Sequence, residues 1–203
     1  MSFAHDTSVA LGLAADVVNS EPGRASAADG FPDVAALEKF LDEHRIVPRR
    51  AAGPADLEAV RDLRPRLFAA WEESGQPGRF AGMVNDLLEE SDARPWLTDH
   101  DGSWHLHVTK PDAPVLHRLA AQIGFAFADL VRLGETERLR HCTAPGCQAV
   151  LVDLSRNRSR LYCDTGNCGN RQHVAAYRAR QADRQTGRRA DDLRDRRPGG
   201  SVR

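Results

Sequence analysis

The chain has 203 residues, with 28 lysines and arginines against 29 aspartates and glutamates, and four cysteines. No segment approaches the roughly 18 consecutive apolar residues that span a bilayer, and His5, Asp6 and Asp16 occupy the region where a secretory leader would be basic and then apolar, so we expect a cytoplasmic protein. Residues 1–137 hold 13 Lys+Arg against 23 Asp+Glu, whereas residues 138–203 hold 15 Arg against 6 Asp, which predicts an acidic body with a basic region attracted to polyanions.

Apolar residues recur at helical spacing through most of the first 95 residues. Four helices are predicted there, with a Gly/Pro/Ser-rich loop between the first two. Asp33 is placed to cap the second helix, and Pro65 lies inside the third, where we expect a kink or a break. The predicted helices cover residues 8–19, 33 to before Pro48, 54 to before Gly75, and 80–88.

A short β-hairpin and one long helix complete the N-terminal region. Residues 96–98 and 104–108 are β-favouring runs with Asp101-Gly102 between them, a pattern typical of a hairpin. An apolar helix is predicted from about Val115 to Leu133, with Gly134 placed to close it. The N-terminal domain is therefore expected to be mainly α with one small β-hairpin.

The four cysteines form two pairs with the same internal spacing, Cys142-x4-Cys147 and Cys163-x4-Cys168, separated by fifteen residues. Two such pairs joined by a short polar hairpin predict a tetrahedral thiolate cage for one structural Zn²⁺ ion. A disulfide pair is the main competing interpretation, which the expected reducing compartment disfavours, and iron–sulfur ligation is the rarer one. His141 is a possible additional donor, although four thiolates already complete a tetrahedron.

The cysteine-rich region predicts a small treble-clef-like zinc finger, built as a knuckle, a hairpin and a helix. Residues 149–152 are strand candidates, and a helix is predicted from Cys168 with Val174 and Tyr177 on its inner face. The chain after this helix has almost nothing to bury, which predicts a disordered basic tail. We expect the zinc module and the helical body to be separable in stability. The predicted boundaries are 1–137 for the helical domain, 138–185 for the finger and 186–203 for the tail.

The segment from Cys142 to Arg180, with Cys168-Gly169-Asn170-Arg171 within it, strongly resembles the CGNR zinc finger. This finger names a family of bacterial proteins regarded as stress-induced transcription regulators, in which it follows a mostly helical domain called ABATE. The resemblance implies that the four cysteines bind zinc, that Asn170 and Arg171 complete the signature, and that the basic residues bind DNA. It is specific over about forty residues and weaker over the first 140, where Leu11–Ser20 resembles the family's opening helix.

Six arginines are candidate contacts to DNA phosphates. If residues 156–160 are extended, alternate side chains share one face and three arginines form a row; the alternative is a solvated hairpin tip. In the helix that follows, Arg171 and Arg178 share a face, although Arg171 and Asn170 have an alternative role in hydrogen-bonding the groups around the metal. The candidate contacts are Arg156, Arg158, Arg160, Arg171, Arg178 and Arg180.

Two further pairs of polar residues are candidate ligand sites. His105 and His107 fall on one face of a strand and are a conceivable second metal site, with a solvent-facing hairpin edge as the favoured interpretation. Asp16 and Asn19 lie three apart on the first helix, where they would line a small-molecule pocket of a sensor-like domain or make a hydrogen bond at the helix end.

Catalysis finds little support in the sequence. It contains no glycine-rich phosphate loop, no nucleophile elbow and no His-Glu-x-x-His string, and a four-thiolate zinc leaves no open position for water. We therefore expect a DNA-binding transcription regulator that is not an enzyme. The alternative is a zinc-stapled module that binds protein or RNA without sequence-specific DNA recognition.

Overall fold

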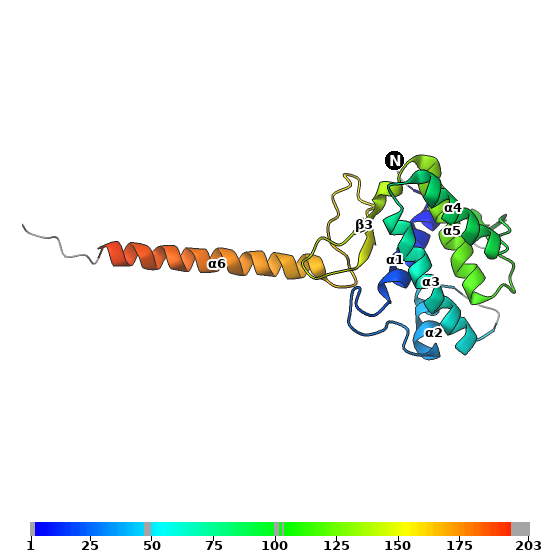
Figure 1. Cartoon of the computed structure of the whole chain (residues 1–203), viewed down its shortest axis with the longest axis horizontal. Helices are drawn as coiled ribbons and strands as arrows, with labels where there is room; N and C mark the ends of the chain where they lie inside the picture. Colours follow the sequence, from blue (N-terminus) through cyan, green and yellow to red (C-terminus); the bar gives the residue numbers. More distant parts are fainter. Residues whose placement is uncertain (1–2, 47–49, 100–101, 103, 196–203) are drawn as a thin grey trace, which may run out of the picture.

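The computed structural model describes residues 3–46, 50–99, 102 and 104–195, with side chains described as far as Gln181 except for that of His105. Helices dominate this part of the chain, and two antiparallel hairpins accompany them, so the predicted mainly α class is confirmed (Figure 1). In chain order the elements are α1 (His5–Asn19), α2 (Val34–Glu43), α3 (Pro54–Glu72), α4 (Pro77–Glu90), β1 (Trp96–Asp99), β2 (Trp104–His107), α5 (Val115–Leu133), the 3-10 turn η1 (Thr136–Arg138), β3 (Leu139–His141), β4 (Val150–Val152) and α6 (Cys168–Asp195).

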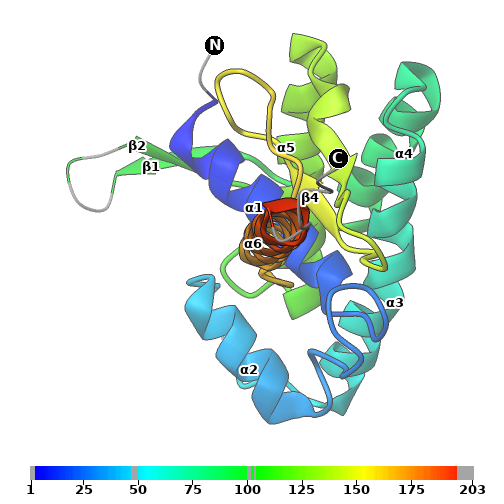
Figure 2. The same ribbon diagram turned by 90° about the vertical axis from the view of Figure 1, so that its left-hand side faces the viewer.

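The core is organised around α5, which packs against α1, α3 and α4 (Figure 2). Leu119, Ile123 and Phe127 recur every four residues along α5 and are fully buried, as the apolar spacing of this segment predicts. The Phe127 ring lies 5.9 Å from that of Trp71 on α3 and 5.4 Å from that of Phe80 on α4. Aromatic contacts from one helix thus join three helices into a single core.

Local sequence signals predict the start of α2 correctly but not the course of α3. The Asp33 carboxylate accepts a hydrogen bond of 2.8 Å from the backbone N–H of Ala36, so it caps α2 as predicted. The expected break at Pro65 is absent, because α3 is continuous through it. Leu63 and Leu67 on either side of Pro65 are buried in the core, and this packing outweighs the loss of one helical hydrogen bond.

The β3–β4 hairpin belongs to the same core as the helices. Leu139 of β3 pairs with Val152 of β4, and both side chains, together with Val150, are buried against the body. Helix α1 lies along β4, where the Asn19 side chain hydrogen-bonds both backbone groups of Val150, and the Trp71 indole donates to the carbonyl of Leu151 (Figure 2). The cysteine-rich region therefore packs as part of the body, and we revise the expectation that the two are separable in stability.

Helix α6 projects away from the body along its whole length (Figure 1). Val174 and Tyr177 are 48% and 57% exposed, so the prediction that they face inward is wrong: within the described part of the chain, no other element reaches them. The helix also continues to Asp195, past residue 186 where the sequence predicts a disordered tail. Its alanines, arginines and glutamines are strong helix formers, which favours helix without a packed face.

The predicted hairpin at residues 96–108 is confirmed as β1 paired with β2, with Trp96 opposite His107. It extends from the body as an arm, and Trp104 is 71% exposed (Figure 2). None of the helices in the described ranges has the length and apolar character needed to cross a bilayer.

Candidate metal centre and nucleic-acid interface

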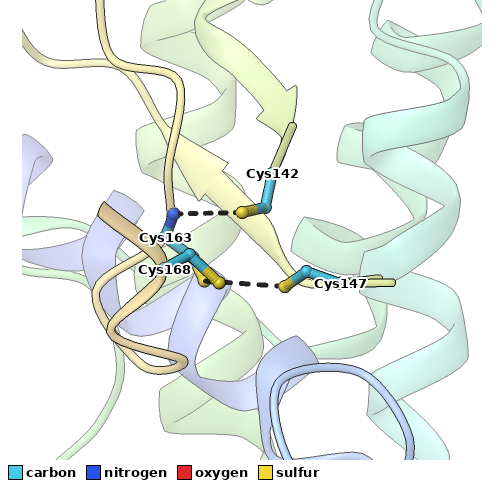
Figure 3. A group of neighbouring side chains, drawn as sticks. All are labelled: Cys142, Cys147, Cys163 and Cys168. Atoms are coloured by element: carbon cyan, nitrogen blue, oxygen red, sulfur yellow. Dashed lines mark hydrogen bonds between the residues drawn. The ribbon is translucent and has the colours of Figure 1, made fainter. Parts of the chain in front are cut away.

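The four cysteine side chains converge on one point between the β3–β4 hairpin and the start of α6 (Figure 3). Their sulfur atoms all lie within 4.8 Å of one another, with Cys163 Sγ 3.8 Å from Cys147 Sγ and 3.6 Å from Cys168 Sγ. Four Zn–S bonds of about 2.3 Å in a tetrahedron place the sulfurs about 3.8 Å apart. All four cysteines are free, which removes the disulfide interpretation. The geometry fits one structural zinc ion.

Tight turns bring each cysteine pair together. Gly146 adopts φ +72° in the first knuckle, where the backbone N–H of Cys147 donates to the carbonyl of Ala144. In the second knuckle, a Cβ atom on Gly166 would lie 3.1 Å and 3.2 Å from the sulfurs of Cys168 and Cys163, closer than ordinary packing allows. Gly166 is a residue that sequence reasoning missed, although its position between two ligands was a signal for it.

The metal centre is covered by the body of the protein. Ala25, in the loop after α1, packs against the cysteine cluster, and the backbone N–H of Gln148 donates to the carbonyl of Arg24. Arg24 itself stacks over the Phe68 ring of α3, 3.5 Å from its centroid. His141 points to α3 as well, where its Nε2 lies 3.2 Å from a carboxylate oxygen of Glu72, and it is not among the residues whose ligand atoms converge.

Burial and hydrogen bonds shift the thiol pKa values of two cysteines, Cys163 and Cys168, in opposite directions. Burial raises the pKa of the Cys163 thiol to about 12, so an ion that binds there must displace a proton. Burial also opposes ionisation of Cys168, but the guanidinium of Arg171 donates a 2.8 Å hydrogen bond to its sulfur and, with the neighbouring sulfurs, holds the pKa of Cys168 below its ordinary value. The side chain of Asn170 donates to that of Asn167 and braces the turn that precedes α6.

The predicted row of arginines at residues 156–160 is not formed. This segment is a turn in which Arg158 has φ +50°, so the side chains do not alternate as they would along a strand. Arg158 instead reaches the Glu135 carboxylate at 2.7 Å, and Arg160 pairs with Asp164. Arg156 is exposed, and among the described residues its side chain has no hydrogen bond or ion pair.

One buried carboxylate shapes this turn. Asp153 is fully buried; one of its oxygens accepts from the backbone and hydroxyl of Ser155, and the other from the backbone N–H of Arg160 and from Arg140 at 3.0 Å. Burial opposes its ionisation, but these four donors outweigh it and hold the pKa of Asp153 below its ordinary value. Sequence reasoning missed Asp153, for which a lone acid inside a basic segment was the available signal.

Asp153→Asn should lower the free energy of unfolding by about 1–3 kcal/mol, because an amide cannot accept all four hydrogen bonds. The pKa of Asp153 is lower in the folded than in the unfolded protein, so its contribution is complete above the unfolded value near 4 and is lost as pH falls through the folded value. Urea unfolding should therefore give the same difference at pH 7 and pH 5. Asp42→Asn, at an exposed position of α2, is the control, and a difference that changes between these pH values would contradict the assignment.

Three arginines of α6 have described side chains, and all three are exposed: Arg171, Arg178 and Arg180. Arg171 and Arg178 line one shallow hollow together with Asn167, Asn170, Val174 and Ala175, so the prediction that these two arginines share a face is confirmed. Arg180 lies outside the hollow and is exposed. Of the six predicted arginines, Arg156, Arg178 and Arg180 therefore present exposed guanidinium groups without a partner in the described chain, whereas the other three have structural contacts.

The remaining candidate ligand sites have structural explanations or lie outside the described side chains. Asn19 is held in its double hydrogen bond with β4, and Asp16 lies 3.5 Å from the His44 imidazole. Burial raises the pKa of Asp16, and Asp164 of the finger adds to the shift. The His107 ring stacks on Trp96, while the His105 side chain lies outside the described residues. The cysteine cluster is the one group of possible metal ligands found among the side chains that are described.

Comparison with known protein families gives two matches that together span most of the chain. Residues 138–181 match the family described as "CGNR zinc finger", and residues 11–134 match ABATE, described as "Putative stress-induced transcription regulator". No curated protein is similar enough to the chain to count as a relative. The ABATE match runs from the middle of α1 to the end of α5, and the zinc-finger match covers β3, β4 and the start of α6. The resemblance seen in the sequence is therefore confirmed.

Proposed function

Since the chain belongs to the family of ABATE-domain proteins with a C-terminal CGNR zinc finger, we propose that it is a transcription regulator whose finger binds DNA. The observation that carries this proposal is α6, which begins at the zinc ligand Cys168 and leaves Arg178 and Arg180 exposed and without partners in the described chain. Arg156 is a third free cation on the same finger. Guanidinium groups without an internal partner are the ones available to phosphates.

The zinc has a structural role in this proposal. Four thiolates would close the coordination shell and fix the start of α6 against the hairpin, and no position would remain for activating a water molecule. The protein is thus proposed to act by binding and not by catalysis. The helical domain would act as a sensor or interaction domain in the stress response that the family's description names, with Asn19 and Trp71 as its contacts to the finger.

Replacing Arg156, Arg178 and Arg180 with alanine should weaken binding to all duplex sequences and flatten the dependence of log K on log salt concentration by roughly 2 to 3 units. Each phosphate contact contributes about 0.9 to this slope, because it releases condensed counterion. Titrations of labelled duplex DNA at several salt concentrations measure the slope. A matched triple replacement of the exposed body arginines Arg79, Arg94 and Arg132 is the control and should leave the slope unchanged.

An alternative function rests on the apolar residues of the same helix. Val174 and Tyr177 are about half exposed and lie three apart, as in a helix that docks in the groove of a partner protein. If the triple replacement on the finger leaves DNA affinity and slope unchanged while Val174→Ser abolishes association with a protein partner, the finger is a protein-binding module and the DNA-binding proposal fails.

A further inference from the structure

A small polar cavity lies in the finger region, beside the 3-10 turn that connects it to the helical body. It has a volume of about 180 Å³ and is lined by residues from η1, β3 and the turn after β4: Glu137, Arg138, Arg140, Asp153 and Arg158. Three of the five lining residues are arginines, and neither Arg138 nor Arg140 was among the candidates that the sequence offered. Four of the five residues lie within the zinc-finger match, 138–181, and Glu137 lies in the short segment between the two family matches.

Arg138 and Arg140, which line the cavity, each have N–H groups that are not used in hydrogen bonds with the described chain. Arg138 is 6% exposed; its Nε donates to Glu135 at 2.9 Å and its Nη1 donates to the carbonyls of Asp153 and Ser155. Arg140 uses only its Nη1, toward Asp153 and two backbone carbonyls. A guanidinium carries five N–H donors, so Nη2 of each residue has no partner in the described chain. Because Arg138 and Arg140 both line the cavity, we take these donors as the ones available to an acceptor that enters it.

The acidic residues nearby pair with the arginines of the cavity but do not use all of their N–H donors. Both oxygens of Asp153 already accept two hydrogen bonds each, and Glu135 is held between Arg138 and Arg158. Glu137 lies at the rim, with a side chain that is 79% exposed and 3.9 Å from Arg158. Three arginines against Glu137 and Asp153 give the lining residues a net charge of +1, and Glu135, which pairs with Arg138 and Arg158 from outside the lining, brings the whole cluster to zero. The bound acids orient the arginines without satisfying all of their donors.

The size of the cavity selects the class of ligand. A water molecule takes about 30 Å³ of liquid volume, so the cavity holds about six waters or one tetrahedral oxyanion with its remaining hydration. Drug-sized ligands and nucleotides need cavities of roughly 300 Å³ or more. Planar guanidinium groups match phosphate oxygens in pairs, and three of them suit a phosphate better than a single carboxylate.

We propose that this cavity is a binding site for one phosphate group. The group has two sources with the same chemistry: free inorganic phosphate, or a backbone phosphate of the DNA that the finger is proposed to bind. The second source rests on the proposed function, and the first does not. In either case Arg158, expected from the sequence to lie in a row of DNA contacts, lines the pocket together with Arg138 and Arg140 and is held there by Glu135.

Phosphate binding is measured on the zinc-loaded full chain by calorimetry and by phosphorus NMR line broadening, with sulfate-free potassium chloride at matched ionic strength as reference. Arg158→Gln should weaken binding at least fivefold, while Arg156→Gln, in the same turn but outside the cavity, should leave it unchanged. Glu137→Gln removes a rim charge and should tighten binding about threefold, as a charge several ångströms away in a high-dielectric setting implies. Glu89→Gln on α4 is its control. The Glu137 replacement is exposed, so its result does not depend on whether Arg158→Gln folds normally.

Titration with duplex DNA distinguishes free phosphate from a backbone phosphate as the ligand of the cavity. Phosphate binding that responds to Arg158→Gln and Glu137→Gln establishes the free anion as a ligand. No binding of free phosphate, together with a salt slope for duplex DNA that falls by about one unit in Arg158→Gln, establishes a backbone phosphate as the ligand. No binding of free phosphate and an unchanged slope overturn the cavity and leave the proposed function standing. Phosphate binding by a chain that binds no DNA supports the cavity and removes the proposed function.

Discussion

Removal of the zinc ion should unfold the helical body together with the finger. The β3–β4 hairpin carries Cys142 at one end and Cys147 before the other strand, and its apolar residues Leu139, Val150 and Val152 are part of the main core. Without the ion the hairpin is no longer held together by the cysteines, and the apolar residues that it contributes to the core lose their packing. Structural zinc contributes about 10–16 kcal/mol of apparent binding free energy, against a typical net stability of 5–15 kcal/mol.

Cys168→Ser and chelation of the wild type should therefore lower the midpoint of thermal unfolding by about 20 °C or more, since a chain of this size loses about 2–4 °C per kcal/mol, with helical and near-ultraviolet signals lost in one transition. Elemental analysis should find one zinc per wild-type chain. His141→Ala is the matched control, because its imidazole pairs with Glu72 and not with the metal, and it should keep the ion. A chelated protein that retains the circular dichroism of the helical body would show that the hairpin is dispensable to the core.

Asn19→Leu should cost about 2–5 kcal/mol of unfolding free energy, a large effect for a change that conserves side-chain volume. The Asn19 amide donates to the Val150 carbonyl at 2.9 Å and accepts from the Val150 N–H at 2.8 Å, so it acts as a neighbouring strand for the free edge of β4. Leucine leaves both buried backbone groups without a partner, at about 1–3 kcal/mol each. Because β4 follows Cys147, zinc affinity should fall as well.

Chemical denaturation of Asn19→Leu and of Asn85→Leu, its control at an exposed position of α4, measures this effect. The control replacement should change the unfolding free energy by less than about 0.5 kcal/mol. A loss below 1 kcal/mol in Asn19→Leu would mean that water or a shifted strand satisfies Val150, and that the finger is held to the body by apolar contacts alone.

The sequence predicted the parts of this protein whose determinants are close together along the chain. The cysteine spacing identifies the ligands because each knuckle is closed by its own turn, with Gly146 in the left-handed conformation of the first. Helix α5 was predicted from its apolar spacing and from Gly134, which ends it at φ +64°. Asp33 was recognised as a cap for the same reason: the groups that it satisfies lie three residues away.

The parts that were not predicted depend on contacts between distant residues. The alternation Arg156, Arg158, Arg160 is the pattern of a strand, but the buried Asp153 draws the backbone of Arg160 toward itself and turns the segment instead. Glu135 then captures Arg158 from 23 residues away. A pattern that indicated a phosphate-binding row therefore describes an internally paired turn, in which Arg156 alone of the three arginines has no partner among the described residues.

The helical spacing of apolar residues led to a wrong prediction of burial in α6. Val174 and Tyr177 recur as they would on a buried face, but an apolar stripe is buried only if another element reaches it. The chain supplies no such element within the described residues, because the helix leaves the body at its first turn. Asn19 shows the converse: the sequence offered a ligand pocket or a hydrogen bond at the helix end for this polar residue, whereas its partner is a strand 131 residues later.

The position of Cys168 at the first residue of α6 makes the metal centre a pivot. A helix of 28 residues is about 42 Å long, so a rotation of about 10° at its base displaces its far end by about 7 Å. The Arg171–Cys168 contact and the turn braced by Asn170 are the described hydrogen bonds that would resist that rotation. If the finger binds DNA as proposed, a small change of angle at Cys168 would therefore decide which phosphates the far end of α6 can reach.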